Sequence, residues 1–215
     1  AIAQWFDIHT ELLEADILNG IEVVNGFTYS REAHQWALDK NLTIFANTDI
    51  HIPMGLEYDL TEQHRPTTLV FAEEKTEAAI RDALFDRRTA VWFGNSLIGS
   101  ADYLAPLFET CIDQEPAAYL ENLAIARLTN RCGIDFFVEN TGEFSFYNST
   151  PFLVFGAGQT VGLAIKTGQR LERIDLELSV RNLHTTPDDV LQTSLSFDVS
   201  GTIPDKKMLD KLGGD

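Results

Sequence analysis

The stretch Thr43-Ile44-Phe45-Ala46-Asn47-Thr48-Asp49-Ile50-His51 decides the predicted fold of the first half of this chain. Its first residues are β-branched or apolar, which is typical of a buried strand, and it ends in Asp-x-His. Side chains two residues apart in an extended backbone point to the same side. One carboxylate oxygen and one imidazole nitrogen can therefore converge, and we predict that Asp49 and His51 are metal ligands.

Strand-like and helix-like segments alternate on both sides of this stretch. Ser30 is a candidate N-cap for a helix in which Ala33, Trp36 and Ala37 form the buried stripe. The predicted helices cover residues 8–18, 30–40, a segment after Thr76, and 101–113, and the predicted strands cover 20–25, 42–46, 68–71 and 89–93. Strands that alternate with helices of this length favour parallel βα units, in an open sheet or in a barrel.

The helical period disappears after Pro116. Apolar residues then alternate with polar ones in five or six short runs, and glycine-containing turn signals separate the runs. This pattern predicts a small antiparallel β-sandwich. We therefore predict an α/β domain at residues 1–115, a β-sandwich at 116–204 and a flexible tail at 205–215.

Composition limits the classes of partner. The chain has 215 residues, and its 44% hydrophobic and 23% charged residues are typical of a soluble globular protein. Its formal charge of −17 repels nucleic acids and anionic membranes, so we expect neither as a partner. The acidity serves solubility alone, or bound divalent metals supply the positive charge for an anionic substrate.

The two cysteines, Cys111 and Cys132, do not match a zinc-binding spacing. We expect two buried free thiols, with a disulfide between them as the alternative.

Several motifs in the first half resemble the C-terminal part of a PHP (polymerase and histidinol phosphatase) domain. The resemblance covers about half of the chain, from His9 to about Asp113. It is strongest where a Gly-Ile-Glu-Val strand and a helix precede the Thr-Asp-x-His motif. The matching segments are Gly20-Ile21-Glu22-Val23-Val24-Asn25, Ala33-His34-Gln35-Trp36-Ala37-Leu38, Leu38-Asp39-Lys40-Asn41-Leu42-Thr43, Asn47-Thr48-Asp49-Ile50-His51, Tyr58-Asp59, His64-Arg65 and Leu69-Val70-Phe71-Ala72.

The resemblance implies the C-terminal part of a distorted βα (PHP/TIM-like) barrel, followed by the small antiparallel β-sandwich. It also implies divalent zinc, manganese or iron ions that activate water to attack a phosphoester. Asp49 and His51 would be metal ligands. Glu22 and Asn25 would support the metal site without being its main ligands. The family resemblance favours an exported or periplasmic protein.

His64-Arg65 follows the metal strand and has two interpretations. The pair can contact the phosphate of a substrate, with a bidentate contact from the guanidinium group. Alternatively, Arg65 pairs with one of the nearby acidic residues Asp59 and Glu62. We carry His64 and Arg65 forward as candidate substrate-binding residues.

The sequence departs from the family in its metal ligands. No His-x-His pair occurs among the five histidines, which are His9, His34, His51, His64 and His184. Two matched ligands cannot hold a multinuclear cluster, because even one catalytic zinc usually needs three protein ligands. We therefore expect an N-terminally truncated segment that is inactive alone. We expect this segment to self-associate or to pair with a missing N-terminal barrel segment. The other explanation is a degenerate domain that has lost its metals.

Three functions follow as hypotheses. The first is a PHP-type metal-dependent phosphoesterase that acts on a small-molecule phosphoester. The second is a non-catalytic β-sandwich binding or assembly module. The third is another metal-dependent hydrolase, such as an amidohydrolase.

Overall fold

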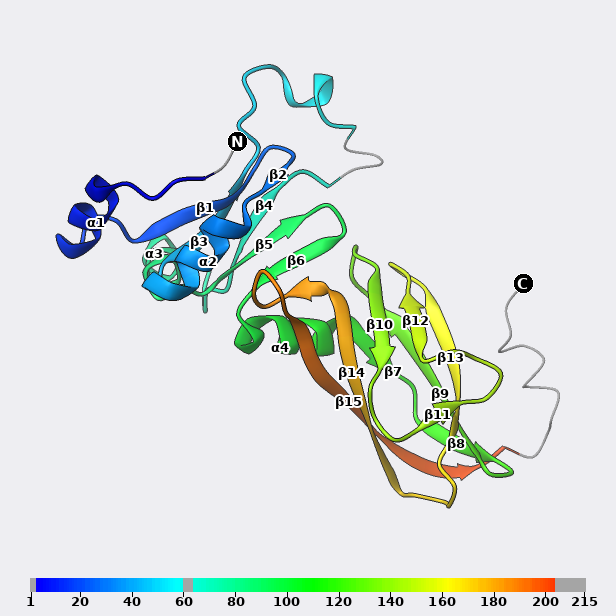
Figure 1. Cartoon of the computed structure of the whole chain (residues 1–215). Coiled ribbons are helices and arrows are strands. Elements are labelled where there is room, and N and C mark those ends of the chain that lie inside the picture. The colour runs from blue at the N-terminus through cyan, green and yellow to red at the C-terminus, as the bar shows by residue number, and fades with distance from the viewer. Residues whose placement is uncertain (1–2, 60–63, 204–215) are drawn as a thin grey trace. The chain divides into compact units, whose positions relative to one another are not determined.

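The computed structural model describes residues 3–59 and 64–203, and these residues form two compact units (Figure 1). Within them, one unit holds residues 3–104 and 183–189, and the other holds 105–182 and 190–203. No sequence pattern predicted that residues 183–189 belong to the first unit. The division at residues 115 and 116 stays a prediction, and the predicted tail at 205–215 lies outside the described residues.

The first unit combines short helices with two small groups of strands. Ser30 caps helix α2, with its hydroxyl oxygen accepting a hydrogen bond from the Ala33 amide at 3.1 Å, as predicted. The elements are α1 (Asp7–Glu14), β1 (Gly20–Asn25), β2 (Thr28–Tyr29), α2 (Arg31–Lys40), β3 (Thr43–Asn47), the 3-10 helix η1 (Met54–Leu56), β4 (Thr67–Val70), α3 (Glu77–Phe85), β5 (Thr89–Phe93) and β6 (Ser96–Gly99).

The predicted βα barrel is wrong. Strands β1 and β3 are parallel, with α2 between them in sequence, but β4, β5 and β6 pair antiparallel in that order. No closed barrel occurs in the described part of the chain. Only Gly94 and Asn95 connect β5 to β6, and such a short connection can join only antiparallel strands. The prediction missed β6, and with it the hairpin that breaks the parallel pattern.

Strand β3 is joined to β4 and β5 through threonine side chains. The Thr68 hydroxyl accepts a hydrogen bond from the Ala46 amide at 2.9 Å and donates one to the Ala46 carbonyl at 3.2 Å. The Thr89 hydroxyl donates to the Ile44 carbonyl at 3.1 Å. These bonds satisfy backbone groups of β3 that no neighbouring strand pairs on that side. They fix the end of β3, from which the chain continues to Asp49 and His51.

The second unit is built mainly from antiparallel strands in two layers, with β15 pairing parallel to β8, so the predicted β-sandwich is confirmed. Strands β12, β10 and β14 form one layer, and β11, β13, β9 and β8 form the other, with β7 also paired to β9. Phe136, Phe155 and Ile165 are fully buried between them. The elements are α4 (Ala101–Cys111), β7 (Ile112–Gln114), β8 (Ala117–Leu120), β9 (Leu123–Asn130), β10 (Phe136–Asn140), β11 (Ser145–Phe146), β12 (Phe152–Phe155), β13 (Thr160–Lys166), β14 (Arg173–His184) and β15 (Val190–Thr202).

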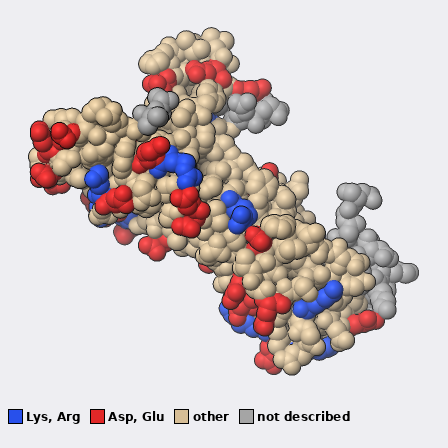
Figure 2. All heavy atoms as spheres, viewed as in Figure 1, with Lys and Arg blue, Asp and Glu red and all other residues tan. Residues whose placement is uncertain are grey.

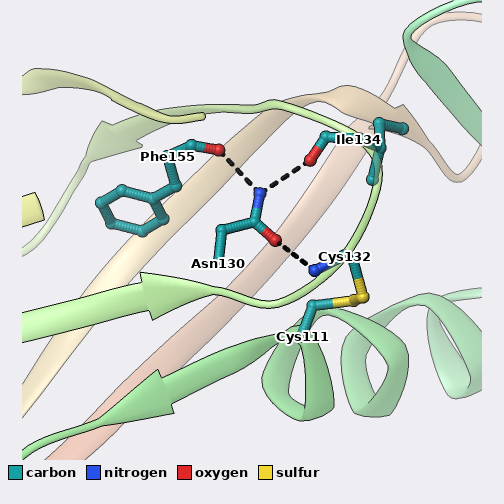
Figure 3. The surroundings of a disulfide bond; sticks show 5 residues. All are labelled: Cys111, Asn130, Cys132, Ile134 and Phe155. Atoms are coloured by element: carbon teal, nitrogen blue, oxygen red, sulfur yellow. Dashed lines mark hydrogen bonds between the residues drawn. A yellow bond between two sulfur atoms is a disulfide. The ribbon is translucent and has the colours of Figure 1, made fainter. Parts of the chain in front are cut away.

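A disulfide bond joins Cys111 at the end of α4 to Cys132 after β9 (Figure 3). The expectation of two free thiols is therefore wrong. The buried Asn130 side chain organises the same turn: its amide donates to the carbonyls of Ile134 (2.7 Å) and Phe155 (2.8 Å), and its carbonyl accepts from the Cys132 amide (2.9 Å). This network aligns Cys132 with Cys111, an arrangement that sequence spacing alone does not reveal.

Acidic side chains are spread over the visible surface, with fewer basic ones between them (Figure 2). This agrees with the count of 33 acidic and 16 basic residues. No helix in the described ranges is long and apolar enough to cross a membrane.

We predict that the double variant Cys111→Ser/Cys132→Ser unfolds at a lower temperature than the wild type. The disulfide closes a loop with a sequence separation of 21 residues, and such a loop contributes about 3 kcal/mol by restricting the unfolded chain. We expect a shift of about 10 °C in a thermal melt. A reducing agent should lower the wild-type melting temperature and leave that of the double variant unchanged. Two titratable thiols in the unfolded, unreduced wild type would contradict the assignment.

Candidate functional site

The structure brings Asp49 and His51 together directly after β3. The His51 Nε2 atom lies 3.4 Å from Asp49 Oδ1. Asp49 has φ of 50°, a left-handed conformation that Asp tolerates better than most residues. Both side chains are open to solvent, with exposed fractions of 58% for Asp49 and 84% for His51. The two predicted ligands are therefore adjacent and accessible, and their role in metal binding stays a prediction.

A shallow depression of about 460 Å³ lies beside Asp49. Its walls come from the end of β3, from the turn that contains Asp49, and from the segment that leads into β4. Arg65 lines this depression, whereas His51 and His64 do not. A carboxylate and a guanidinium group thus share one open depression, and Arg65 is positioned to contact an anion there.

Glu22 is held by two amide side chains. Its Oε2 accepts a hydrogen bond from Asn25 Nδ2 at 2.8 Å, and its Oε1 accepts one from Asn47 Nδ2 at 2.5 Å. Because both carboxylate oxygens are engaged, Glu22 and Asn25 tie the ends of the parallel strands β1 and β3 together. Asn47 completes this cluster and was missed by the sequence reasoning, although its place at the same strand end was a usable signal.

His64 is placed by an aromatic stack. Its ring lies nearly parallel to the Trp92 ring of β5, with centroids 3.6 Å apart and 8° between the planes. Trp92 is itself fixed, since its indole N–H donates to the Gly94 carbonyl at 2.9 Å. Burial lowers the pKa of His64; a backbone hydrogen bond at Arg65 acts in the opposite direction, and the positive charge of Arg65 adds a smaller lowering. No sequence pattern predicted that His64 stacks on Trp92.

Asp49 and His51 do not fit a catalytic metal centre by themselves. Among the described residues there is no cluster of three or more His, Cys, Asp or Glu side chains that could hold a metal ion. A catalytic zinc usually has three protein ligands plus water, and a multinuclear cluster needs more. We therefore derive no catalytic step through a metal from these residues.

In the comparison with protein families, the match covers only part of the chain. Residues 112–196 match the protein family DUF5001, which is described as an Ig-like domain. An Ig-like β-sandwich thus describes this part of the second unit, and the match does not extend to a PHP domain. The comparison with curated proteins gave no match.

A solved structure resembles the chain over most of its length. It is the crystal structure of a two-domain protein from Bacteroides vulgatus that contains a predicted PHP-like metal-dependent phosphoesterase. The two sequences are 33% identical, the TM-score is 0.82, and the match covers 90% of this chain. The chain spans 57% of the length of that protein. The likeness supports the predicted relation to PHP-like phosphoesterases, and it leaves the activity of this chain untested.

We predict that Trp92→Ala raises the pKa of His64 toward its ordinary value, because the substitution exposes the imidazole ring to water. Histidine titration followed by NMR measures this pKa directly. His34 on α2 serves as the internal control, since burial and the neighbouring His184 lower its pKa and Trp92 takes no part. An unaltered His64 titration in the variant would contradict burial by the stack as the cause.

Proposed function

We propose that the second unit is a non-catalytic binding or assembly module that takes an extended apolar segment of a protein partner. The observation that carries this proposal is an exposed apolar surface on the Ig-like fold. We name this surface the β10–β12 strip, and it consists of Phe137, Phe152 and Val154.

The β10–β12 strip lies on the outward face of one sheet. Phe137 in β10 stands directly opposite Val154 in β12, and Phe152 lies two residues from Val154 on the same face of β12. The side chains are exposed by 43%, 59% and 55% in the order Phe137, Phe152, Val154. Neighbouring apolar side chains left in water on a folded domain favour an interaction site, because covering the exposed half of each contributes about 1 kcal/mol.

Strand β12 also offers backbone groups to a partner. In the described part of the sandwich it pairs only with β10, so its other side is a sheet edge. The Phe155 carbonyl at the end of β12 is bonded to Asn130, and the amide and carbonyl of Phe152 are bonded to the Thr150 hydroxyl, so a peptide that pairs along this edge would replace the Thr150 contacts. An extended peptide added at this edge would place alternate side chains beside the strip.

The Ig-like match supports this proposal over a catalytic one for the second unit. Sandwich domains of this architecture present surfaces and loops on a rigid scaffold, and fold alone does not assign chemistry to them. Among the described residues, the sandwich contains no cluster of metal-binding side chains.

We expect selection of extended peptides from a phage-displayed library to enrich sequences with alternating apolar residues. Binding of an enriched peptide to the full chain should fall at least tenfold in Phe152→Arg/Val154→Arg, because two charges then replace the apolar contact. The matched control is Ile17→Arg, which changes an exposed apolar residue of the first unit. The proposal would be overturned if selection on the wild type enriched no more peptides than selection on Phe152→Arg/Val154→Arg. Equal peptide binding by this double variant and by Ile17→Arg would also overturn it.

A second candidate function rests on the likeness to the Bacteroides vulgatus protein. We propose that Asp49 and His51 contribute two ligands to the metal centre of a PHP-like phosphoesterase, with the remaining ligands supplied from outside the described residues. The adjacency of the two side chains and the 33% identity support this candidate.

Elemental analysis for zinc, manganese and iron tests the second candidate. We expect bound metal in the chain to fall by at least half in Asp49→Ala/His51→Ala, while His9→Gln leaves the content unchanged. Equal content of bound metal in the wild type and the double variant would rule out a site at these residues.

A further inference from the structure

The tip of the β14–β15 hairpin, residues 185–189, belongs to the first unit and contacts helix α2. The guanidinium group of Arg31, the first residue of α2, donates to the Pro187 carbonyl at 2.6 Å and to the Asp188 carboxylate. We name this pair of contacts the Arg31 latch. It joins residues that lie 156 and 157 positions apart in the sequence.

The turn is shaped before it meets α2. The Thr186 hydroxyl accepts hydrogen bonds from the amides of Asp188 (3.1 Å) and Asp189 (2.9 Å). The Thr185 amide donates to the Asp189 carbonyl at 3.1 Å. The turn therefore presents the Pro187 carbonyl and the Asp188 carboxylate as a fixed pair, which matches the fork geometry of a guanidinium group.

Two histidines, His34 and His184, lie near the Arg31 latch. His34, one helical turn after Arg31, is 1% exposed, and its Nδ1 atom lies 2.8 Å from the Tyr29 hydroxyl. His184 ends β14, next to the turn, and pairs with Ile98 of β6. His34 and Thr185 line the same cavity of about 400 Å³ inside the first unit.

We propose that the Arg31 latch is an acid-sensitive device, in which protonation of His34 and His184 releases the hairpin tip from α2. The charges around the two histidines favour this outcome. Two protonated histidines would place like charges beside each other and beside the permanent cation of Arg31, and His34 would carry its charge in a buried position.

Titratable groups from several elements face this cluster, and they include Tyr103 of α4 on the cavity wall and Asp189 in the turn. Tyr29 comes from β2, Arg31 and Glu32 from α2, and Asp188 from the turn. Asp86, Arg87 and Asp102 line the cavity beside His34. The exposed Asp188 carboxylate is engaged by Arg31, so it offers little compensation to a buried imidazolium.

The protonation energetics agree with the geometry. Burial, followed by the neighbouring His184, lowers the pKa of His34 to about 4 from 6.5. Burial, followed by the charge of Arg31, lowers the pKa of His184. The closed state thus holds His34 neutral, while an opened state that exposes it takes up a proton as the pH falls through 6.5. Between pH 7 and pH 5 the opening constant should rise about 20-fold from His34 alone.

Hydrogen–deuterium exchange, corrected for the intrinsic pH dependence of exchange, measures this opening in the full chain. We expect protection of peptides covering 97–99 and 183–189 to fall at least tenfold between pH 7 and pH 5. In His34→Gln, where the buried side chain cannot be protonated, the fall should be less than threefold. Arg31→Ala should lower protection of residues 183–189 already at pH 7.

Two controls separate local opening from unfolding. A peptide covering 123–130 in β9 should keep its protection at both pH values, and His9→Gln should behave as the wild type. If β9 loses protection in parallel, the acid effect is global unfolding and the proposal fails. If His34→Gln does not fold, NMR titration of His34 in the wild type and Arg31→Ala decides: the proposal requires a higher His34 pKa in the variant, and equal values overturn it.

Discussion

Every buried backbone group at a strand end or a break between sheets must find a hydrogen-bond partner, and this constraint determines how the two units are built. Thr68 and Thr89 supply that partner on the side of β3 that faces away from β1. In the sandwich, Asn130 bonds the carbonyls of Ile134 and Phe155, and Asn182 accepts from the Phe137 amide and donates to the Asp135 carbonyl. Removing one such side chain would leave a buried group unpaired at a cost of about 1–3 kcal/mol.

The same constraint places the candidate functional surfaces. The threonine contacts hold the end of β3, and the Glu22 cluster with Asn25 and Asn47 ties it to β1, so Asp49 and His51 follow from a fixed strand end. In the sandwich, the Asn130 amide bonds the Phe155 carbonyl at one end of β12, and the Thr150 hydroxyl bonds the backbone groups of Phe152 at the other end. One unit therefore presents the two predicted metal ligands, and the other presents an apolar strip beside a sheet edge.

Local patterns in the sequence predicted the parts of the fold that depend on local physics. The cap at Ser30, the strand before Asp49 and the alternating strands after Pro116 depend on nearby residues, and the structure contains them. The barrel prediction was wrong because strand direction depends on long-range pairing, and the β5–β6 hairpin was not recognised. The disulfide was missed because the alignment of Cys132 depends on the contacts of Asn130 with residues distant in sequence. The stack of His64 on Trp92 and the Arg31 latch are long-range contacts of the same kind.

The central claim is that the β10–β12 strip binds an extended apolar segment of a partner. The most direct test is chemical-shift mapping of the backbone amides while the full chain is titrated with an extended peptide of alternating apolar residues. We expect the amide chemical shifts to change within residues 136–155, with the largest changes at 152–154. The amide chemical shifts near Asp49 and Arg65 should not change. Changes centred on Asp49 and Arg65, or no saturable change anywhere, would contradict the central claim.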